Sequence, residues 1–175
     1  MNEADNLALL SKSSSAVEKV NPGAKRVLSS MVADTLALAK KETVRQSRPL
    51  RIVQVNDEPY VLEALGLMIR HCFPEATVLS FNSAIQALEE LSQTNPDLVI
   101  TDDAMPRMRG SELCQRLLDR KVTYPIIVDS PWAPTAQWVR ELSDQGLNVF
   151  FLPVPCDLES LRKAIEAAGL KIPHE

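Results

Sequence analysis

Short apolar runs alternate with amphipathic helical patterns from Leu50 to about Ala168, and this alternation sets the fold. The apolar runs are typical of buried strands, predicted at Leu50–Val55, Thr77–Phe81, Leu98–Thr101, Ile126–Asp129 and Asn148–Leu152. Apolar residues at three- and four-residue spacing predict helices at Pro59–Cys72, Ser83–Ser92, Gly110–Arg120, Thr135–Gln145 and Leu158–Ala168. Because parallel strands need crossover helices, we expect an α/β fold: a five-stranded parallel sheet flanked by helices on both faces.

Acidic residues follow several of the predicted strands. Asn56-Asp57 comes after the first strand, Asp102-Asp103 after the third, and Asp129-Ser130 at the end of the fourth. In a sheet of this kind, ligands bind at the carboxyl ends of the strands. Carboxylates held together there repel one another unless a hard cation such as Mg²⁺ neutralises them, and an Asp oxygen beside such a cation can accept a phosphoryl group.

Composition excludes several other classes of protein. The chain has 175 residues, a net charge of −4 and only five glycines, and it contains neither a dinucleotide-binding glycine motif nor a P-loop. The two histidines, His71 and His174, lie at a helix end and in the tail, so a catalytic triad is not expected. The acidic balance argues against nucleic acid as a partner. No apolar run approaches the roughly 18 residues of a membrane span, and the acidic N-terminus is unlike a secretory signal, so we expect a cytoplasmic protein with no membrane partner.

The charge changes sign near residue 48. Residues 1–48 contain eight Lys or Arg and five Asp or Glu, whereas the remainder contains eleven and eighteen, which predicts a Ser-rich basic extension at 1–48, a domain at 49–170 and a tail at 171–175. Within the extension, an amphipathic helix is predicted at about 24–43. Its apolar stripe needs a cover, for which the alternatives are the following domain, a second copy in a homodimer, or a separate partner protein.

The stretch from Arg51 to about Ala168 resembles a response-regulator receiver domain, which has the flavodoxin-like, CheY-like fold of two-component signalling. The resemblance covers about two-thirds of the chain. It is carried by four strings: RIVQVNDEP at 51–59, DLVITDDAMPRMRG at 97–110, PIIVDS at 125–130 and FLPVPCDLESL at 151–161.

By position, this resemblance implies a phosphoryl-acceptor and Mg²⁺ site. Asp102 matches the aspartate that the family phosphorylates, and Asp57 matches a direct Mg²⁺ ligand. Asn56 stands where the family usually has a second acid, so it would reach the metal only through a water and would weaken the site. Ala104 stands where the family lends a backbone carbonyl to the metal.

The resemblance also implies a switch, and the sequence departs from the family beside it. Ser130 matches the hydroxyl that hydrogen-bonds the phosphoryl group, and Phe151 matches the aromatic switch residue. Val154 replaces the family's lysine, which removes a charge-assisted contact. Asp129 replaces an apolar residue and, by strand alternation, is expected to point away from Ser130 into the apolar layer, where it needs a partner or water. Either the fourth strand ends early, or this edge has been reshaped. Asp103 is expected to face solvent.

Two functions follow from the resemblance. The first is a stand-alone response regulator, phosphorylated at Asp102 by a sensor histidine kinase or a phosphotransfer protein and acting by binding a downstream protein. The second is a phosphorylation-independent pseudo-receiver that serves as an interaction module. An aspartyl-phosphate phosphatase is not expected, because the sequence lacks an Asp-x-Asp pattern after a strand. By resemblance, the contact surface is the fourth helix, fifth strand and fifth helix of the domain, near Trp132 and Trp138.

Overall fold

The computed structural model describes residues 33, 35 and 48–173. Contacts divide the chain into two units, residues 1–48 and 49–175, and the fold described below is that of the second. Most of the helix predicted at 24–43 lies outside the described residues; Ala33 and Thr35, which are described, are helical. The last two residues of the predicted tail also lie outside them.

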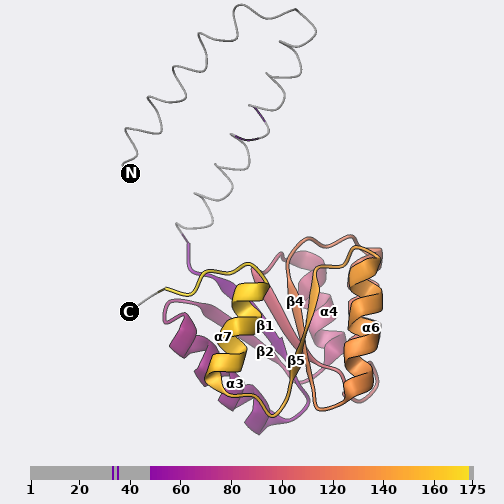
Figure 1. Cartoon of the computed structure of the whole chain (residues 1–175), viewed down its shortest axis with the longest axis horizontal. Helices are drawn as coiled ribbons and strands as arrows, with labels where there is room; N and C mark the ends of the chain where they lie inside the picture. The colour runs from indigo at the N-terminus through magenta and orange to yellow at the C-terminus, as the bar shows by residue number, and fades with distance from the viewer. Residues whose placement is uncertain (1–32, 34, 36–47, 174–175) are drawn as a thin grey trace, which may run out of the picture. The chain divides into compact units, whose positions relative to one another are not determined.

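Strands and helices alternate along the second unit, as predicted (Figure 1). The strands are β1 (Arg51–Val55), β2 (Thr77–Phe81), β3 (Leu98–Asp102), β4 (Ile126–Ser130) and β5 (Val149–Pro153). The helices are α3 (Pro59–Cys72), α4 (Ala84–Gln93), α5 (Gly110–Asp119), α6 (Ala133–Asp144) and α7 (Leu158–Ala167). Every strand and helix predicted between Leu50 and Ala168 is present, with its ends within two residues of the prediction. The fourth strand does not end early, because β4 continues through Ser130.

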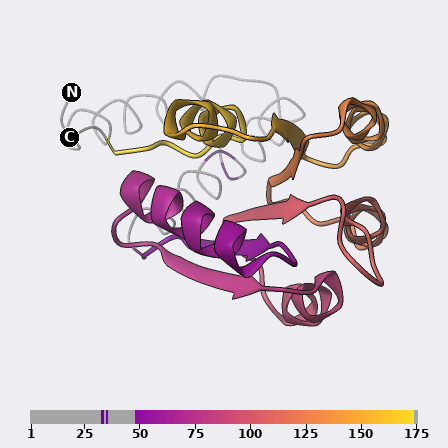
Figure 2. The same ribbon diagram turned by 90° about the horizontal axis from the view of Figure 1, so that it is seen from below.

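All the strands are parallel and lie in the order β2-β1-β3-β4-β5. Helices α3 and α7 cover one face of this sheet, and α4, α5 and α6 cover the other (Figure 2). The chain passes from β1 outward to β2 and then returns to the far side of β1 to form β3. The order reverses there, so the adjacent carboxyl ends of β1 and β3 are where a sheet of this kind binds its ligands.

Successive strand residues enter two separate apolar layers. On β3, Val99 packs with the cluster beneath α4, α5 and α6, whereas Leu98 and Ile100 pack with the cluster beneath α3 and α7. On β4, Val128 and Ile127 divide in the same way. This period of two continues to the strand ends, where it decides which polar side chains meet.

Helix α5 begins unusually close to the end of β3. A Cβ atom built on Gly110 would lie 2.2 Å from the carbonyl oxygen of Asp102 and 2.9 Å from Cα of Asp103. The Gly110 N–H donates to the Asp103 carbonyl oxygen at 3.0 Å. A residue without a Cβ is therefore required at position 110, and it sets the first turn of α5 against the two aspartates.

Within the described part of the chain, no helix combines the length and the apolar character needed to cross a membrane.

Candidate functional site

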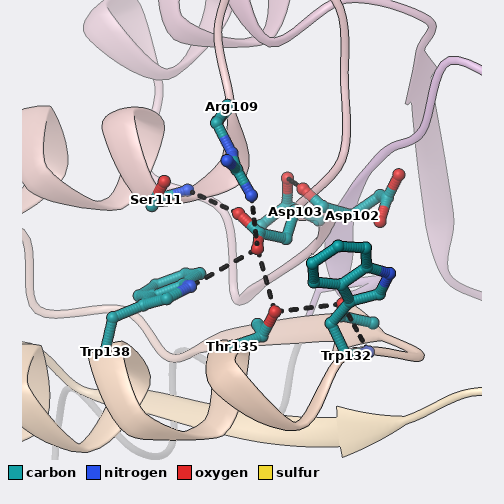
Figure 3. Close-up of polar contacts among 9 residues, drawn as sticks. Asp102, Asp103, Arg109, Ser111, Trp132, Thr135 and Trp138 are labelled. Carbon is teal, nitrogen blue, oxygen red and sulfur yellow. Dashed lines mark hydrogen bonds and ion pairs between the residues drawn. The ribbon is translucent and has the colours of Figure 1, made fainter.

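The two consecutive aspartates at the end of β3 point in opposite directions (Figure 3). Alternation along the strand places Asp102 on the side of α3 and α7, and Asp103 on the side of α5 and α6. Asp102 is half-buried, whereas Asp103 is only 3% exposed. The expectation that Asp103 faces solvent is therefore wrong, because the side chain turns inward to a set of hydrogen-bond donors.

Asp102 lies in an acidic, partly desolvated environment. Burial raises the pKa of its carboxyl group, the charges of Asp57 and Asp103 raise it further, and the backbone N–H groups of Ala104 and Asp103 oppose the shift. Asp57 is half-buried just beyond β1, which pairs directly with β3. Ionisation of Asp102 is thus disfavoured unless a cation offsets the charge of the nearby carboxylates.

The donor atoms at this edge suit a hard cation. The groups that the resemblance assigns to Mg²⁺ are the Asp57 and Asp102 carboxylates and the Ala104 carbonyl. They offer oxygen atoms only, which Mg²⁺ prefers as ligands. Over residues 33, 35 and 48–173, no group of three or more His, Cys, Asp or Glu side chains is arranged to hold a metal, so a backbone carbonyl and waters would have to complete the shell. Asn56 is buried, and its Oδ1 accepts the Glu58 N–H at 2.9 Å, which shapes the turn carrying Asp57.

Asp129 is a buried acid with an unsatisfied oxygen. It is the register neighbour of Asp102 on one side and of Leu152 on the other, and it is 5% exposed. Its Oδ1 has no hydrogen-bond partner among the described residues. Burial, with a further contribution from the Asp102 charge, raises the pKa of this carboxyl to about 7. The expected position in the apolar layer is confirmed, and the acid is held there partly protonated near neutral pH.

Val154 follows β5 directly and is half-buried. Its backbone N–H donates to the Ser130 carbonyl oxygen at 3.2 Å, which fixes it beside the end of β4. The Val154–Pro155 peptide bond is cis. A branched apolar side chain therefore stands where the resemblance predicts an ammonium group.

Ser130 belongs to a buried hydroxyl network on the opposite face from Asp102. Its Oγ accepts the Trp132 N–H at 3.2 Å and lies 3.1 Å from Thr135 Oγ1. Thr135 Oγ1 in turn lies 2.9 Å from Asp103 Oδ2. Ser130 and Thr135 are each 1% exposed, so the chain of contacts is closed to bulk water.

Three further donors converge on the Asp103 carboxylate (Figure 3). Ser111 N donates to Oδ1 at 3.3 Å, from the first turn of α5. Arg109 Nη2 and Trp138 Nε1 each approach Oδ2 at 3.4 Å. Neither Thr135 nor Asp103 is predicted from the sequence to be a site residue. Alternation beyond β3 could have signalled the burial of Asp103, but no pattern in the sequence points to Thr135.

The aromatic residues near this network differ in exposure. Phe151 and Trp138 are half-buried against the cluster beneath α4, α5 and α6. Trp132, which caps the start of α6, is 65% exposed. Of the two tryptophans, Trp132 is thus exposed enough to contact a partner, whereas Trp138 packs against the interior.

Known proteins are similar to this chain in sequence. The family model for the response regulator receiver domain matches residues 52–166. The response regulator MprA of Mycobacterium leprae is 32% identical over 118 residues, which cover 67% of this chain and 50% of that protein. A protein-glutamate methylesterase/protein-glutamine glutaminase of Syntrophus aciditrophicus is 33% identical over 87 residues, covering 49% of this chain and 25% of its own.

Solved structures agree on the fold. The signal receiver domain of the response regulator NarL from Mycobacterium tuberculosis superposes with a TM-score of 0.60 at 20% identity, covering 71% of this chain and 99% of that one. The chain spans about half the length, or less, of the curated relatives it matches. With the family model matching well over half of the chain, this protein belongs to the response-regulator receiver-domain family.

Proposed function

We propose that this chain accepts a phosphoryl group on Asp102 with the help of Mg²⁺ and signals by binding a downstream protein. A sensor histidine kinase or a phosphotransfer protein would supply the phosphoryl group. The observation that carries the proposal is the half-buried Asp102 carboxylate at the β1/β3 switch point, with the Asp57 carboxylate nearby. Membership of the receiver family supports the same role.

The chemistry needs an ionised Asp102. One carboxylate oxygen forms a bond to phosphorus as the bond between phosphorus and the donor's nitrogen breaks, and the donor histidine recovers its proton. Burial and the neighbouring carboxylates disfavour the ionised form, whereas the Ala104 and Asp103 N–H groups favour it. Mg²⁺, when bound, offsets the negative charge brought together by the carboxylates and the phosphate. Asp57, Asp102 and the Ala104 carbonyl would hold it, with Asn56 contributing through water.

Binding rather than catalysis would carry the output. The proposed contact surface is made by α6, β5 and α7, with Ser130 and Phe151 relaying the state of Asp102 to it. Trp132, 65% exposed at the start of α6, is the aromatic anchor that such a surface favours. A second copy of the chain could occupy this surface in place of a different protein.

A second candidate function is favoured by the residues beside Asp102. Val154 brings no positive charge, and buried Asp129 adds an acid on the same face. These two features weaken the attraction of the site for phosphate. They support a pseudo-receiver that binds its partner without phosphorylation.

Intact-mass measurement with a small phosphodonor distinguishes the two functions. The full chain is incubated with acetyl phosphate, with Mg²⁺ or with EDTA. We expect one added phosphoryl group only with Mg²⁺, no addition to Asp102→Asn, and continued addition to Asp103→Asn, the adjacent matched control. An unmodified wild-type chain, or equal modification of Asp102→Asn, would overturn the proposal and leave the pseudo-receiver.

A further inference from the structure

We infer that Thr135 and Asp103 are positioning residues that hold the single hydroxyl proton of Ser130 away from Asp102. The inference rests on the proposed function, in which Ser130 donates a hydrogen bond to the phosphoryl group. Thr135 would then compete with the phosphoryl group for the same proton. The strength of the contact between Thr135 and Asp103 would set how readily Ser130 releases Thr135 to bind the phosphoryl group.

The direction of each hydrogen bond follows from counting protons. A carboxylate surrounded by donors can only accept, and Asp103 receives Ser111 N–H, Arg109 Nη2–H and Trp138 Nε1–H. Thr135 Oγ1, 2.9 Å from Asp103 Oδ2, therefore donates its only proton there.

The same count fixes the role of Ser130. Because the proton of Thr135 is committed to Asp103, the 3.1 Å contact with Ser130 Oγ requires Ser130 to donate and Thr135 to accept. The Trp132 N–H, a donor 3.2 Å from Ser130 Oγ, fills an acceptor position. Every hydrogen-bonding partner found for the Ser130 hydroxyl thus lies on the side of α6, and its proton is in use.

A phosphoryl group on Asp102 would require that proton. Phosphoryl oxygens accept hydrogen bonds and do not donate them, so Ser130 can bind one only by releasing Thr135. Asp102 lies on the opposite face of the sheet from Asp103, so the release is a change of side-chain rotamer and not a small adjustment.

The network ties this rotamer to two helices. Asp103 holds the first turn of α5 through Ser111 and reaches α6 through Thr135 and Trp138. Departure of Ser130 would remove one partner of Thr135 and relax the start of α6, where Trp132 is exposed. The positioning residues therefore connect the phosphoryl site with the proposed contact surface.

The first half of the test needs no phosphate. Side-chain couplings of Ser130 are measured by NMR in the full chain for the wild type, Thr135→Val and Thr135→Ser. Valine has nearly the shape of threonine without the hydroxyl, and serine keeps it. We expect one Ser130 rotamer in the wild type and in Thr135→Ser, and averaging over rotamers in a folded Thr135→Val. An unchanged single rotamer in Thr135→Val would overturn the inference whatever the phosphate site does.

The second half measures the affinity for beryllofluoride with Mg²⁺. Freeing the proton of Ser130 removes one buried hydrogen bond that the bound state must break, so Thr135→Val should bind about three- to tenfold more tightly than the wild type. Thr135→Ser should match the wild type. In the Ser130→Ala background, Thr135→Val should change nothing, because the contested proton is gone.

The outcomes separate the inference from the function beneath it. If the rotamer changes as expected but no variant binds beryllofluoride, the positioning by Thr135 stands and the phosphoryl-acceptor function fails. If the wild type binds and Thr135→Val binds with equal affinity, or the gain persists without Ser130, the inference is overturned while the function stands. If Thr135→Val does not fold, Asp103→Asn replaces it, since a carboxamide accepts the Thr135 proton more weakly than a carboxylate. The same rotamer averaging and a smaller gain in affinity are then expected, and their absence contradicts the inference.

Discussion

Asp103 and Asp129 are two buried acids on opposite faces of the sheet, at the ends of adjacent strands. They are 3% and 5% exposed, yet their surroundings differ completely. Four donors surround Asp103, whereas one oxygen of Asp129 has no partner among the described residues. Equal burial thus has opposite consequences: the first carboxylate organises two helices, and the second is held in part as the neutral acid.

The largest effect on stability is expected at Gly110, which sets the first turn of α5 against the two aspartates. Gly110→Ala places a Cβ atom 2.2 Å from the Asp102 carbonyl oxygen, so α5 must move away from Asp103. We expect the free energy of unfolding to fall by about 3 kcal/mol or more in urea denaturation. Gly169→Ala is the control: φ is +89°, but nothing lies within 4 Å, so a loss of about 1–2 kcal/mol is expected. Equal losses in the two variants would show that α5 tolerates the displacement.

The next largest effect is expected from removing Asp103, the acid whose carboxylate accepts hydrogen bonds from four donors. Asp103→Ala removes the carboxylate that accepts from the Thr135 hydroxyl and leaves the Ser111 N–H without its acceptor, which we expect to lower the free energy of unfolding by about 2–4 kcal/mol. Asp103→Asn keeps one acceptor oxygen and should lose less than half as much. A loss below about 1 kcal/mol in Asp103→Ala would mean that the network contributes little to stability.

Asp129, the acid with an oxygen left unpaired among the described residues, predicts that the free energy of unfolding rises as the pH falls. The pKa of Asp129 is about 7 in the folded state against 3.8 for an ordinary aspartate, so the folded chain binds more protons between these values. Stability contributed by the neutral acid is complete below pH 4 and is lost as the pH rises toward 7. Acidification from pH 8 to pH 5 should therefore raise the free energy of unfolding by about 2–3 kcal/mol.

Asp129→Asn, which cannot ionise, isolates this contribution. Urea midpoints measured between pH 5 and pH 8 should become nearly flat in this variant, apart from the smaller contribution of Asp102, whose pKa is also raised. A wild-type slope that survives the substitution would assign the pH dependence to other groups.

The smallest effect is expected from Val154→Lys, which restores the positive charge that the family's lysine would supply. Val154→Lys places an ammonium group at the end of β5, on the Asp129 side of Asp102, and a charge-assisted contact of this kind should tighten beryllofluoride binding about tenfold in the presence of Mg²⁺. Val154→Met, which adds length without charge, is the matched control. An affinity that stays unchanged, or falls, in the lysine variant would show that this edge no longer discriminates by charge.

Most of the fold was predictable because its signals are local. Between residues 50 and 168, the alternation predicted the ends of every strand and helix to within two residues. Asp157 caps α7 by accepting the Ser160 N–H at 2.8 Å. Ser83 occupies the corresponding position before α4, but its side chain makes no capping hydrogen bond. The period of two also predicted that Asp129 points into the apolar layer.

The network around Asp103 could not be predicted because its donors come from distant positions. Ser111 lies eight residues along the chain and Thr135 thirty-two, and nothing in a linear pattern says that α5 and α6 bring them to one carboxylate. The partial protonation of Asp129 likewise depends on burial and on a neighbouring strand, which appear only in three dimensions.

The two indole N–H resonances of the chain test most directly whether Asp102 and the Asp103 network are linked. The full chain is titrated with beryllofluoride in the presence of Mg²⁺, with Asp102→Asn as the control. Trp138, which donates to Asp103, should shift and reach saturation together with the amide of Ser130, and neither should move in Asp102→Asn. A shift of the amides around Asp102 that leaves the Trp138 indole and Ser130 unmoved would contradict the account.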